Sequence, residues 1–421
     1  MLRTGSGTCN GYPFQVSGKA CPISAEHAPV MRVLSVGFMY PPHHHGGYEL
    51  TWQVSVEALR QRGHHVRVLC ADWRRPQTCE TDTQAEDVHR ELHTYWRDHA
   101  FPRLGLRARV QLERHNARAL QRHLDELAPD VVNWWPIGSF SMALIEQAHR
   151  RSLPAVGVIN DDWLRYGARA DQWTRMFARA APLGNVAERV LSLPARADLD
   201  GAAHWIFNSE YTRTRAATAA LTRTSVAHPG VDRHLFAAAP RPEWRWRLLY
   251  VGRLDERKGV DTIVSALPLL PPEATLRIVG SGDEAYRLRL LAQIGALGLG
   301  ERIRLESLER AQLPGAYAQA DVVVFPSRWE EPWGLVGLEA MAVGAPLAAT
   351  AGGGSAEYLR DGENCLTFPP DDPLALADRV RRLAGDADLR SALEHAGHRT
   401  AERYPESAFT DAVVTAIERA A

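Results

Sequence analysis

Short apolar runs alternate with longer amphipathic stretches along the chain after residue 30. In the first half, six such runs are typical of buried strands: residues 32–38, 65–70, 130–134, 155–159, 205–208 and 225–228. Residues 48–62 instead repeat apolar side chains at helical spacing and are followed by Gly63, a residue that commonly ends helices. This strand–helix–strand alternation predicts parallel strands in a doubly wound sheet.

The same alternation starts again after an Ala- and Pro-rich segment at residues 237–242, which we expect to be a linker. The strands predicted in this half are 246–251, 276–279, 303–305 and 322–326, with short ones near Leu347 and Leu366. The predicted helices are 260–270, 284–297, 313–320, 335–343 and an amphipathic final helix near 406–419. The repeat predicts an α/β protein with two Rossmann-like doubly wound domains. Ligands bind beyond the carboxyl ends of such strands, so the site is expected in a cleft between the two domains.

A chain of 421 residues exceeds the size at which one hydrophobic core normally stops growing. We expect a disordered N-terminal extension at 1–30, domains at 31–240 and 241–405, and a final helix at 406–421. Residues 1–30 lack the continuous apolar segment of a signal peptide. Because the first strand opens at Met31, that residue is a natural start of translation.

Composition narrows the class of protein. Net charge is −1 and charged residues make up 24%, which gives no electrostatic reason to expect nucleic acid as a partner. The five cysteines are scattered and form no CxxC pair, which favours reduced thiols and no cysteine zinc site. No apolar run is long enough to span a membrane. We therefore expect a cytoplasmic protein.

Two glutamates, Glu331 and Glu339, lie before and inside the predicted helix 335–343. Eight residues at helical rise place them roughly 12 Å apart, the order of distance between the hexose and ribose of a nucleotide sugar. The start of the helix exposes backbone N–H groups that suit a diphosphate. Those groups belong to Trp333, Gly334 and Leu335. The alternative is an ordinary helix with one solvated glutamate and one glutamate matched to the helix dipole.

A turn opened by Gly252 carries Arg253 and Lys258 directly after the first strand of the second domain. Two cations there would neutralise a diphosphate leaving group. The alternative is a pair of surface charges. Lys258 and Lys19 are the only lysines among 49 Lys and Arg residues, and a compact ammonium is not interchangeable with a guanidinium at a crowded anionic site.

Gly46 and Gly47 follow the first strand and would let the backbone approach a phosphate or an acceptor closely. A Gly pair is also common in plain turns. The three histidines before it, at 43–45, are neighbours in a loop and are not expected to converge on one metal ion. We predict no metal.

Together these segments resemble the retaining family-4 glycosyltransferases, whose GT-B fold has two Rossmann-like domains facing across a cleft. The resemblance covers about residues 31–421. It rests on the Gly-Gly loop, His228–Asp232, Gly252-Arg253, Lys258-Gly259, Gly280–Gly282, Ala320-Asp321 and the pair Glu331/Glu339.

The resemblance implies a role for each matching residue. Arg253 and Lys258 would hold the donor diphosphate, Glu331 the hydroxyls of the transferring sugar, and Glu339 the ribose. Gly47 would lie against the phosphates or the acceptor. Backbone groups would bind the sugar and phosphate from Trp333, Gly334 and Leu335. The resemblance also implies catalysis without a metal, and a final helix that crosses back onto the first domain.

One segment departs from the pattern. Many relatives have His-Asp at the end of a first-domain strand, where this chain has Asn160, Asp161, Asp162 and Trp163. Asn can hydrogen-bond a sugar or phosphate but cannot accept a proton. Either that histidine is dispensable, or Asp161 or Asp162 substitutes for it, or turnover is weak. The two acids would otherwise cap the following helix, and Trp163 would either stack on an acceptor or pack in the core.

Four arginines share one face of a predicted helix at spacings of seven, four and four: Arg107, Arg114, Arg118 and Arg122. Such a face either lies on an anionic membrane surface or is solvated and paired with acids.

The sequence thus predicts a retaining glycosyltransferase that moves a sugar from a nucleotide diphosphate sugar to a saccharide, a lipid-linked sugar or a secondary metabolite. Two alternatives stay open: a phosphorylase or inverting transferase of the same fold, and a nucleotide-sugar-binding protein with a degenerate site.

Overall fold

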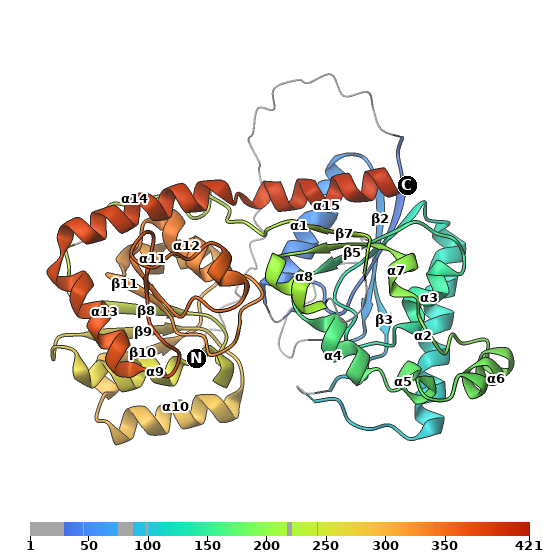
Figure 1. Ribbon diagram of the computed structural model, residues 1–421, viewed down its shortest axis with the longest axis horizontal. Helices are drawn as coiled ribbons and strands as arrows, with labels where there is room; N and C mark the ends of the chain where they lie inside the picture. The colour runs from blue at the N-terminus through green and yellow to red at the C-terminus, as the bar shows by residue number, and fades with distance from the viewer. Residues whose placement is uncertain (1–28, 45, 75–86, 98–99, 217–220, 242) are drawn as a thin grey trace, which may run out of the picture. The chain divides into compact units, whose positions relative to one another are not determined.

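The computed structural model describes residues 29–421 except 45, 75–86, 98–99, 217–220 and 242. The prediction for the N-terminal extension therefore falls almost wholly outside the described residues. Residues Met31–Ala421 form one compact unit that contains two parallel sheets (Figure 1).

The first sheet has seven parallel strands in the order β3-β2-β1-β4-β5-β6-β7. The strands are β1 (Arg32–Val36), β2 (His65–Ala71), β3 (Val88–Leu92), β4 (Val131–Trp134), β5 (Ala155–Ile159), β6 (His204–Phe207) and β7 (Thr224–Val226). The helices between them are α1 (Gly47–Gln61), α2 (Leu106–Leu127), α3 (Ala143–His149), α4 (Trp163–Ala170), α5 (Thr174–Phe177), α6 (Ala181–Leu191), α7 (Leu199–Ala202) and α8 (Glu210–Ala216). The order reverses between β1 and β4, the switch point at which doubly wound folds bind ligands.

The second sheet has six parallel strands in the order β10-β9-β8-β11-β12-β13. The strands are β8 (Arg247–Val251), β9 (Thr275–Val279), β10 (Ile303–Glu306), β11 (Val322–Phe325), β12 (Leu347–Ala349) and β13 (Leu366–Thr367). The helices are α9 (Val260–Ala266), α10 (Glu284–Ala296), α11 (Leu313–Gln319), α12 (Leu335–Val343), α13 (Pro373–Gly385), α14 (Ala387–Arg403) and α15 (Glu406–Ala420). The two sheets confirm the predicted fold class.

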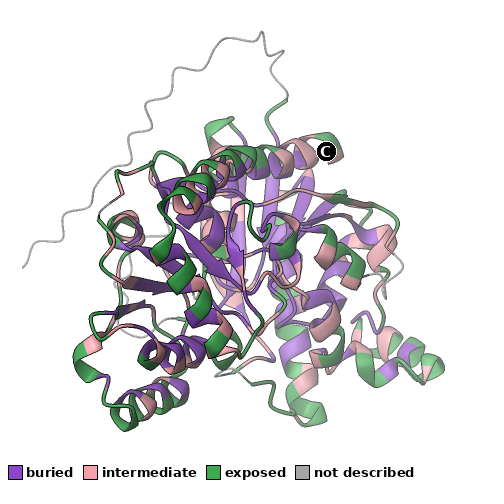
Figure 2. Ribbon diagram, turned by 60° about the vertical axis from the view of Figure 1, so that its left-hand side comes forward, coloured by how far each residue is buried: buried purple, intermediate pink, exposed green. Residues whose placement is uncertain are grey.

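The central strands of both sheets are buried on both faces, and their alternating side chains enter different apolar clusters on the two sides. In β1, Leu34 and Val36 belong to one apolar cluster and Val33 to another. In β8, Leu248 and Leu249 divide between two clusters in the same way. The central strands are accordingly buried while the helices keep exposed outer faces (Figure 2).

The last helix, α15, packs against α1 and the first sheet (Figure 1). Phe409 and Val413 lie in the same apolar cluster as Trp52. Just before it, the chain runs beside the segment that follows β7: Val231 N donates to Tyr404 O at 2.9 Å, and Glu406 N donates to Val231 O at 3.2 Å.

The predicted boundary between domains, at residues 240 and 241, falls between β7 and β8. The division into those ranges stays a prediction. Within the described part of the chain, no helix combines the length and the apolar character needed to cross a membrane.

Candidate active site

The sequence placed Lys258 and Glu331 in one site, and the structure brings them into contact. Lys258 Nζ lies 2.6 Å from Glu331 Oε1, and Ser327 Oγ donates to the same oxygen at 2.7 Å. Glu331 is only 5% exposed. Lys258 follows β8 and Glu331 follows β11, two neighbouring parallel strands, so their carboxyl ends deliver both side chains to one edge of the sheet.

The glycine after Lys258 allows this approach. Gly259 has φ +65°, and a Cβ there would lie 2.2 Å from Pro326 O. A residue with a side chain would therefore push the Lys258 turn away from the end of β11.

Arg253 lies on the turn after β8, with Nη2 3.6 Å from Asp255 Oδ2 and 40% of its side chain exposed. Gly252 before it has φ +151°, which favours glycine. The Arg253 guanidinium is thus held beside the Lys258 turn and remains accessible to an anion.

Glu339 lies on α12 and is buried. It accepts a hydrogen bond from Tyr317 Oη at 2.8 Å and lies 3.4 Å from Arg310 Nη1. Burial raises the pKa of Glu339, while Arg310 and Tyr317 oppose the shift. Glu331 and Glu339 both raise the pKa of buried Tyr358, after burial itself, which places that phenol within electrostatic reach of both carboxylates.

The start of α12 is fixed by Gly334, whose φ is +90°. Trp333 before it is buried, donates from Nε1 to Pro229 O at 2.7 Å, and stacks on His228 at a ring separation of 4.4 Å. The first N–H groups of a helix have no intrahelical partner, so this end of α12, from Gly334 to Leu335, is suited to an anion.

On the first sheet, Gly46 N donates to Glu49 Oε2 at 3.0 Å and forms the start of α1. Burial of the carboxyl group raises the pKa of Glu49 to about 7. A Cβ on Gly47 would lie 3.8 Å from Leu335 Cδ1, an ordinary contact, so Gly47 faces the start of α12. Tyr48 Oη donates to Val158 O at 2.7 Å and accepts from Asn160 N at 3.1 Å.

Asn160 leaves one acceptor available at the end of β5. Its Oδ1 is buried and has no hydrogen-bond partner among the residues that the structure describes. The backbone carbonyl oxygen of Asn160 accepts a hydrogen bond from Asn208 Nδ2 at 2.9 Å. The side-chain oxygen therefore has acceptor capacity that no described residue uses.

The acids after Asn160 differ in role. Asp161 accepts from Trp163 N at 2.9 Å and from Tyr166 Oη at 3.2 Å, and burial raises its pKa to about 7. Asp162 is the N-cap of α4 but makes no side-chain capping bond. Burial is the main cause of both raised pKa values, and Arg253 opposes the rise in Asp161 and in Glu49 as a lesser cause. Arg253, which was predicted to hold the diphosphate, therefore lies within electrostatic reach of Asp161 and Glu49 on the side of the first sheet.

The side chain of Trp163 is fully buried and lies 5.8 Å from the Trp205 ring. This position favours core packing over stacking on an acceptor. Beside Asp162 the chain has a cavity of about 190 Å³. Its lining includes Asp162, Tyr211, Arg215, Arg328, Glu330 and Pro332.

Comparisons with known proteins agree with this geometry. Residues 45–235 match the family described as Glycosyltransferase Family 4, and residues 232–400 match the one described as Glycosyl transferases group 1. The chain belongs to the family-4, group 1 glycosyltransferases.

Two curated glycosyltransferases illustrate the similarity. The chain is 32% identical to D-inositol 3-phosphate glycosyltransferase of Thermobispora bispora over 47% of its own length and 51% of that protein. It is 33% identical to GDP-mannose-dependent alpha-(1-6)-phosphatidylinositol monomannoside mannosyltransferase of Mycolicibacterium smegmatis, over 45% of its own length and 55% of that protein. The chain thus spans about half the length of the curated relatives it matches.

Among solved structures, the chain shares its fold with Anabaena HepE in complex with UDP-glucose. The TM-score is 0.66 at 20% identity, over 92% of this chain and all of that one. The predicted GT-B fold is confirmed.

Several contacts of this glycosyltransferase site were not predicted from the sequence. Ser327, Arg310 and Tyr317 hold the two glutamates, and Tyr48 and Glu49 shape the first-sheet side. Only Glu49 carried a readable signal, because an acid three residues after Gly46 is the pattern of a helix capping box.

Proposed function

We propose that the chain transfers a hexosyl group from a nucleotide diphosphate sugar to an acceptor hydroxyl, with retention of the anomeric configuration. The observation that carries the proposal is the Lys258–Glu331 contact at the ends of β8 and β11. A cation and a carboxylate in one place can serve a leaving diphosphate and a neighbouring sugar.

In this mechanism Lys258 and Arg253 neutralise the charge that grows on the departing diphosphate. Glu331 accepts hydrogen bonds from the hydroxyls of the transferring sugar, and Glu339 binds the ribose. The backbone of Gly334 and Leu335 contacts the sugar and phosphate. Positive side chains supply the charge, so the proposed transfer needs no metal and no cofactor.

The acceptor hydroxyl attacks the anomeric carbon from the face that the diphosphate leaves, and its proton passes to a phosphate oxygen. No side chain has to accept that proton, so Asn160 is compatible with turnover. Asn160 Oδ1 would instead accept a hydrogen bond from the sugar or the acceptor. Gly46, Gly47 and the acids Asp161 and Asp162 complete the acceptor side.

A nucleotide hexose as the class of donor is supported by HepE, which was solved in complex with UDP-glucose, and by the GDP-mannose named for the mycobacterial relative. We propose a nucleotide hexose as donor and a saccharide, lipid-linked sugar or hydroxylated metabolite as acceptor. Cytoplasmic location, and contact with an anionic membrane through the four arginines of α2, stay predictions.

The first experiment is a thermal-shift panel of UDP-, GDP-, ADP- and dTDP-sugars with the full chain. Binding to the folded state alone raises Tm by mass action, so the donor is identified without the acceptor. The preferred donor is then supplied to candidate acceptors, and release of the nucleoside diphosphate is measured.

Lys258→Ala and Glu331→Ala are each expected to reduce that release by at least about 100-fold. Arg304→Ala is the matched control, because that cation lies on β10 with 77% of its side chain exposed. Wild-type rates in either active-site variant would overturn the assignment. NMR of the product anomer tests retention, and sugar phosphate formed from added phosphate would indicate a phosphorylase instead.

A further inference from the structure

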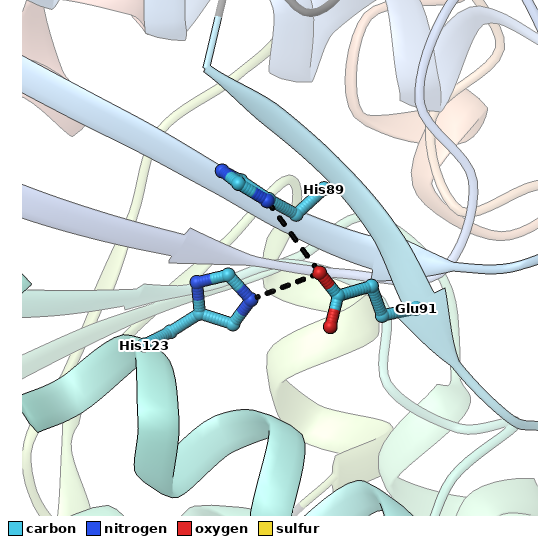
Figure 3. Close-up of side chains that lie close together, drawn as sticks. All are labelled: His89, Glu91 and His123. Carbon is cyan, nitrogen blue, oxygen red and sulfur yellow. Dashed lines mark ion pairs between the residues drawn. The ribbon is translucent and has the colours of Figure 1, made fainter. Parts of the chain in front are cut away.

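Three potential metal ligands meet at the edge of the first sheet, on elements that contribute nothing to the proposed donor site. His89 and Glu91 are two residues apart on β3 and face the same side, where His123 of α2 meets them (Figure 3). Glu91 Oε1 lies 3.5 Å from His89 Nδ1 and 3.5 Å from His123 Nε2. All three ligand atoms lie within 4.8 Å of one another.

The spacing matches a small tetrahedral ion. Ligand atoms about 2.1 Å from a tetrahedral zinc ion lie about 3.4 Å from each other. The two imidazole nitrogens lie within 4.8 Å of each other and would have to draw together around an ion. The two 3.5 Å separations from Glu91 already match the tetrahedral spacing. They are too long for hydrogen bonds, so the contacts as they stand do not satisfy the ring nitrogens.

His123 provides an independent observation. It is 1% exposed, and neither of its ring nitrogens has a hydrogen-bond partner among the described residues. Imidazole nitrogens are the commonest metal ligands in proteins, so a buried ring without hydrogen bonds is a candidate ligand.

The surrounding groups orient the ligands as an outer shell does. Asp87 Oδ1 lies 2.7 Å from His89 Nε2, which leaves Nδ1 of that ring directed at Glu91. Arg122 pairs with Oε2 of Glu91 and leaves Oε1 toward the two rings.

Nearby charge does not exclude a cation. Glu91, Asp87 and Glu126 face the two guanidinium groups of Arg67 and Arg122. The carboxylates outnumber the guanidinium groups, so a dication enters a locally negative environment.

We propose that His89, Glu91 and His123 bind a zinc-type divalent cation. Two imidazoles and one carboxylate form a ligand set that zinc accepts, with water as the fourth ligand. The ion would tie the edge strand β3 to α2 and would stabilise this side of the first domain. The proposal does not depend on the sugar-transfer reaction, because both ligand-bearing elements lie outside the donor site.

The test measures metal bound to the full chain. The protein is stripped with a chelator and dialysed against Zn²⁺ alone, and bound zinc is measured by elemental analysis. Co²⁺ is added in parallel, because a tetrahedral site gives cobalt a strong visible absorption. We expect one equivalent of zinc, a tetrahedral cobalt spectrum, and an unfolding equilibrium constant lowered about 100-fold when free Zn²⁺ is 100 times Kd.

His123→Gln and Glu91→Gln should each abolish stoichiometric binding and the cobalt spectrum. Asp87→Asn should weaken affinity about 10- to 100-fold, because it weakens the orienting contact to His89 and the ion pair with Arg67 while it leaves the three ligands in place. The matched control replaces both His93 and His115 with glutamine. Their rings stack 3.7 Å apart, and they lie just after β3 and on α2, close in sequence to the proposed ligands.

Far-UV circular dichroism of each metal-free variant shows that it has folded. Glu91→Gln changes a half-exposed residue and keeps the test decisive where His123→Gln fails to fold. Wild-type protein that binds no zinc would overturn the proposal. So would full binding by folded Glu91→Gln, or binding that is lost only when the loop histidines at 43–45 are replaced.

Discussion

Replacing Lys258 with Met tests how strongly the buried carboxylate of Glu331 depends on its partner. Glu331 is 5% exposed and accepts from Lys258 Nζ at 2.6 Å and from Ser327 Oγ at 2.7 Å. Met keeps most of the apolar stem and removes only the charge. Removing one partner of a buried ion pair costs about 3–5 kcal/mol, because the remaining charge is uncompensated.

We expect the lower end of that range, about 3 kcal/mol, for two reasons. The Lys258 side chain is 22% exposed, so water can partly replace it, and Ser327 still donates to Glu331. Glu331→Gln in the Lys258→Met background should restore about 2 kcal/mol, because the amide oxygen can still accept from Ser327 while the uncompensated charge is gone.

The assay is urea denaturation of the wild type, both single variants and the double variant, followed by tryptophan fluorescence and by circular dichroism. Coincident transitions are required before a free energy of unfolding is calculated, because the chain has two sheets. A loss below about 1 kcal/mol in Lys258→Met would refute the reasoning. Additive destabilisation in the double variant would do the same.

Three further outcomes follow from the geometry. Burial raises the pKa of Glu49 to about 7, so its proton favours the folded state and its own contribution to stability is lost as the pH rises from 4 to 7. In urea titrations at both pH values, the stability at pH 4 relative to that at pH 7 should be about 2 kcal/mol lower in Glu49→Gln than in the wild type. Asn160→Ala should lower kcat/KM about 10-fold or more with Tm almost unchanged, because the deleted Oδ1 has no partner in the described chain; an equal loss of stability would contradict this. Gly259→Ala should lower the free energy of unfolding by at least about 2 kcal/mol, because its Cβ would lie 2.2 Å from Pro326 O. The control Gly298→Ala, at φ +64° in open space, should lower it by about 1 kcal/mol. Equal losses would show that the close approach is unimportant.

Most of the fold followed from the sequence, because fully buried parallel strands are continuous apolar runs. The runs at 155–159 and 322–326 correspond to β5 and β11 within a residue. Strand β3 was missed since His89, Arg90 and Glu91 interrupt any apolar run, as an edge strand with one neighbour allows. The predicted helix 260–270 ends at Ala266 and continues as a 3-10 turn, because Pro268 lacks the N–H that an α-helix needs.

Helices α13 and α14 were not predicted, although each begins with a recognisable cap. Asp372 accepts from Ala375 N, and Asp386 accepts from Leu389 N. Aspartate before a helical repeat is a strong start signal, so this omission could have been avoided.

The candidate site could be predicted from the sequence only in part. That Lys258 and Glu331 belong to one site was predicted from their motifs and from the family resemblance, whereas their direct contact is seen only in the structure. The partners of Glu339 could not be predicted, since Arg310 precedes α11, Tyr317 lies within it, and their approach depends on how two helices pack. The same holds for Asn160, whose free oxygen is evident only once Tyr48 and Asn208 are seen to bind its backbone.

The paired segments around Val231 and Tyr404 have a mechanical consequence. The polypeptide passes from the first sheet to the second after β7 and returns before α15, and the backbone bonds of Val231 join the outgoing and returning strands of chain side by side. Two connecting segments that lie side by side permit the sheets to rotate about the line through both segments, but they resist twisting and sliding across that line. Any movement of one sheet relative to the other would therefore be restricted to rotation about this pair of segments.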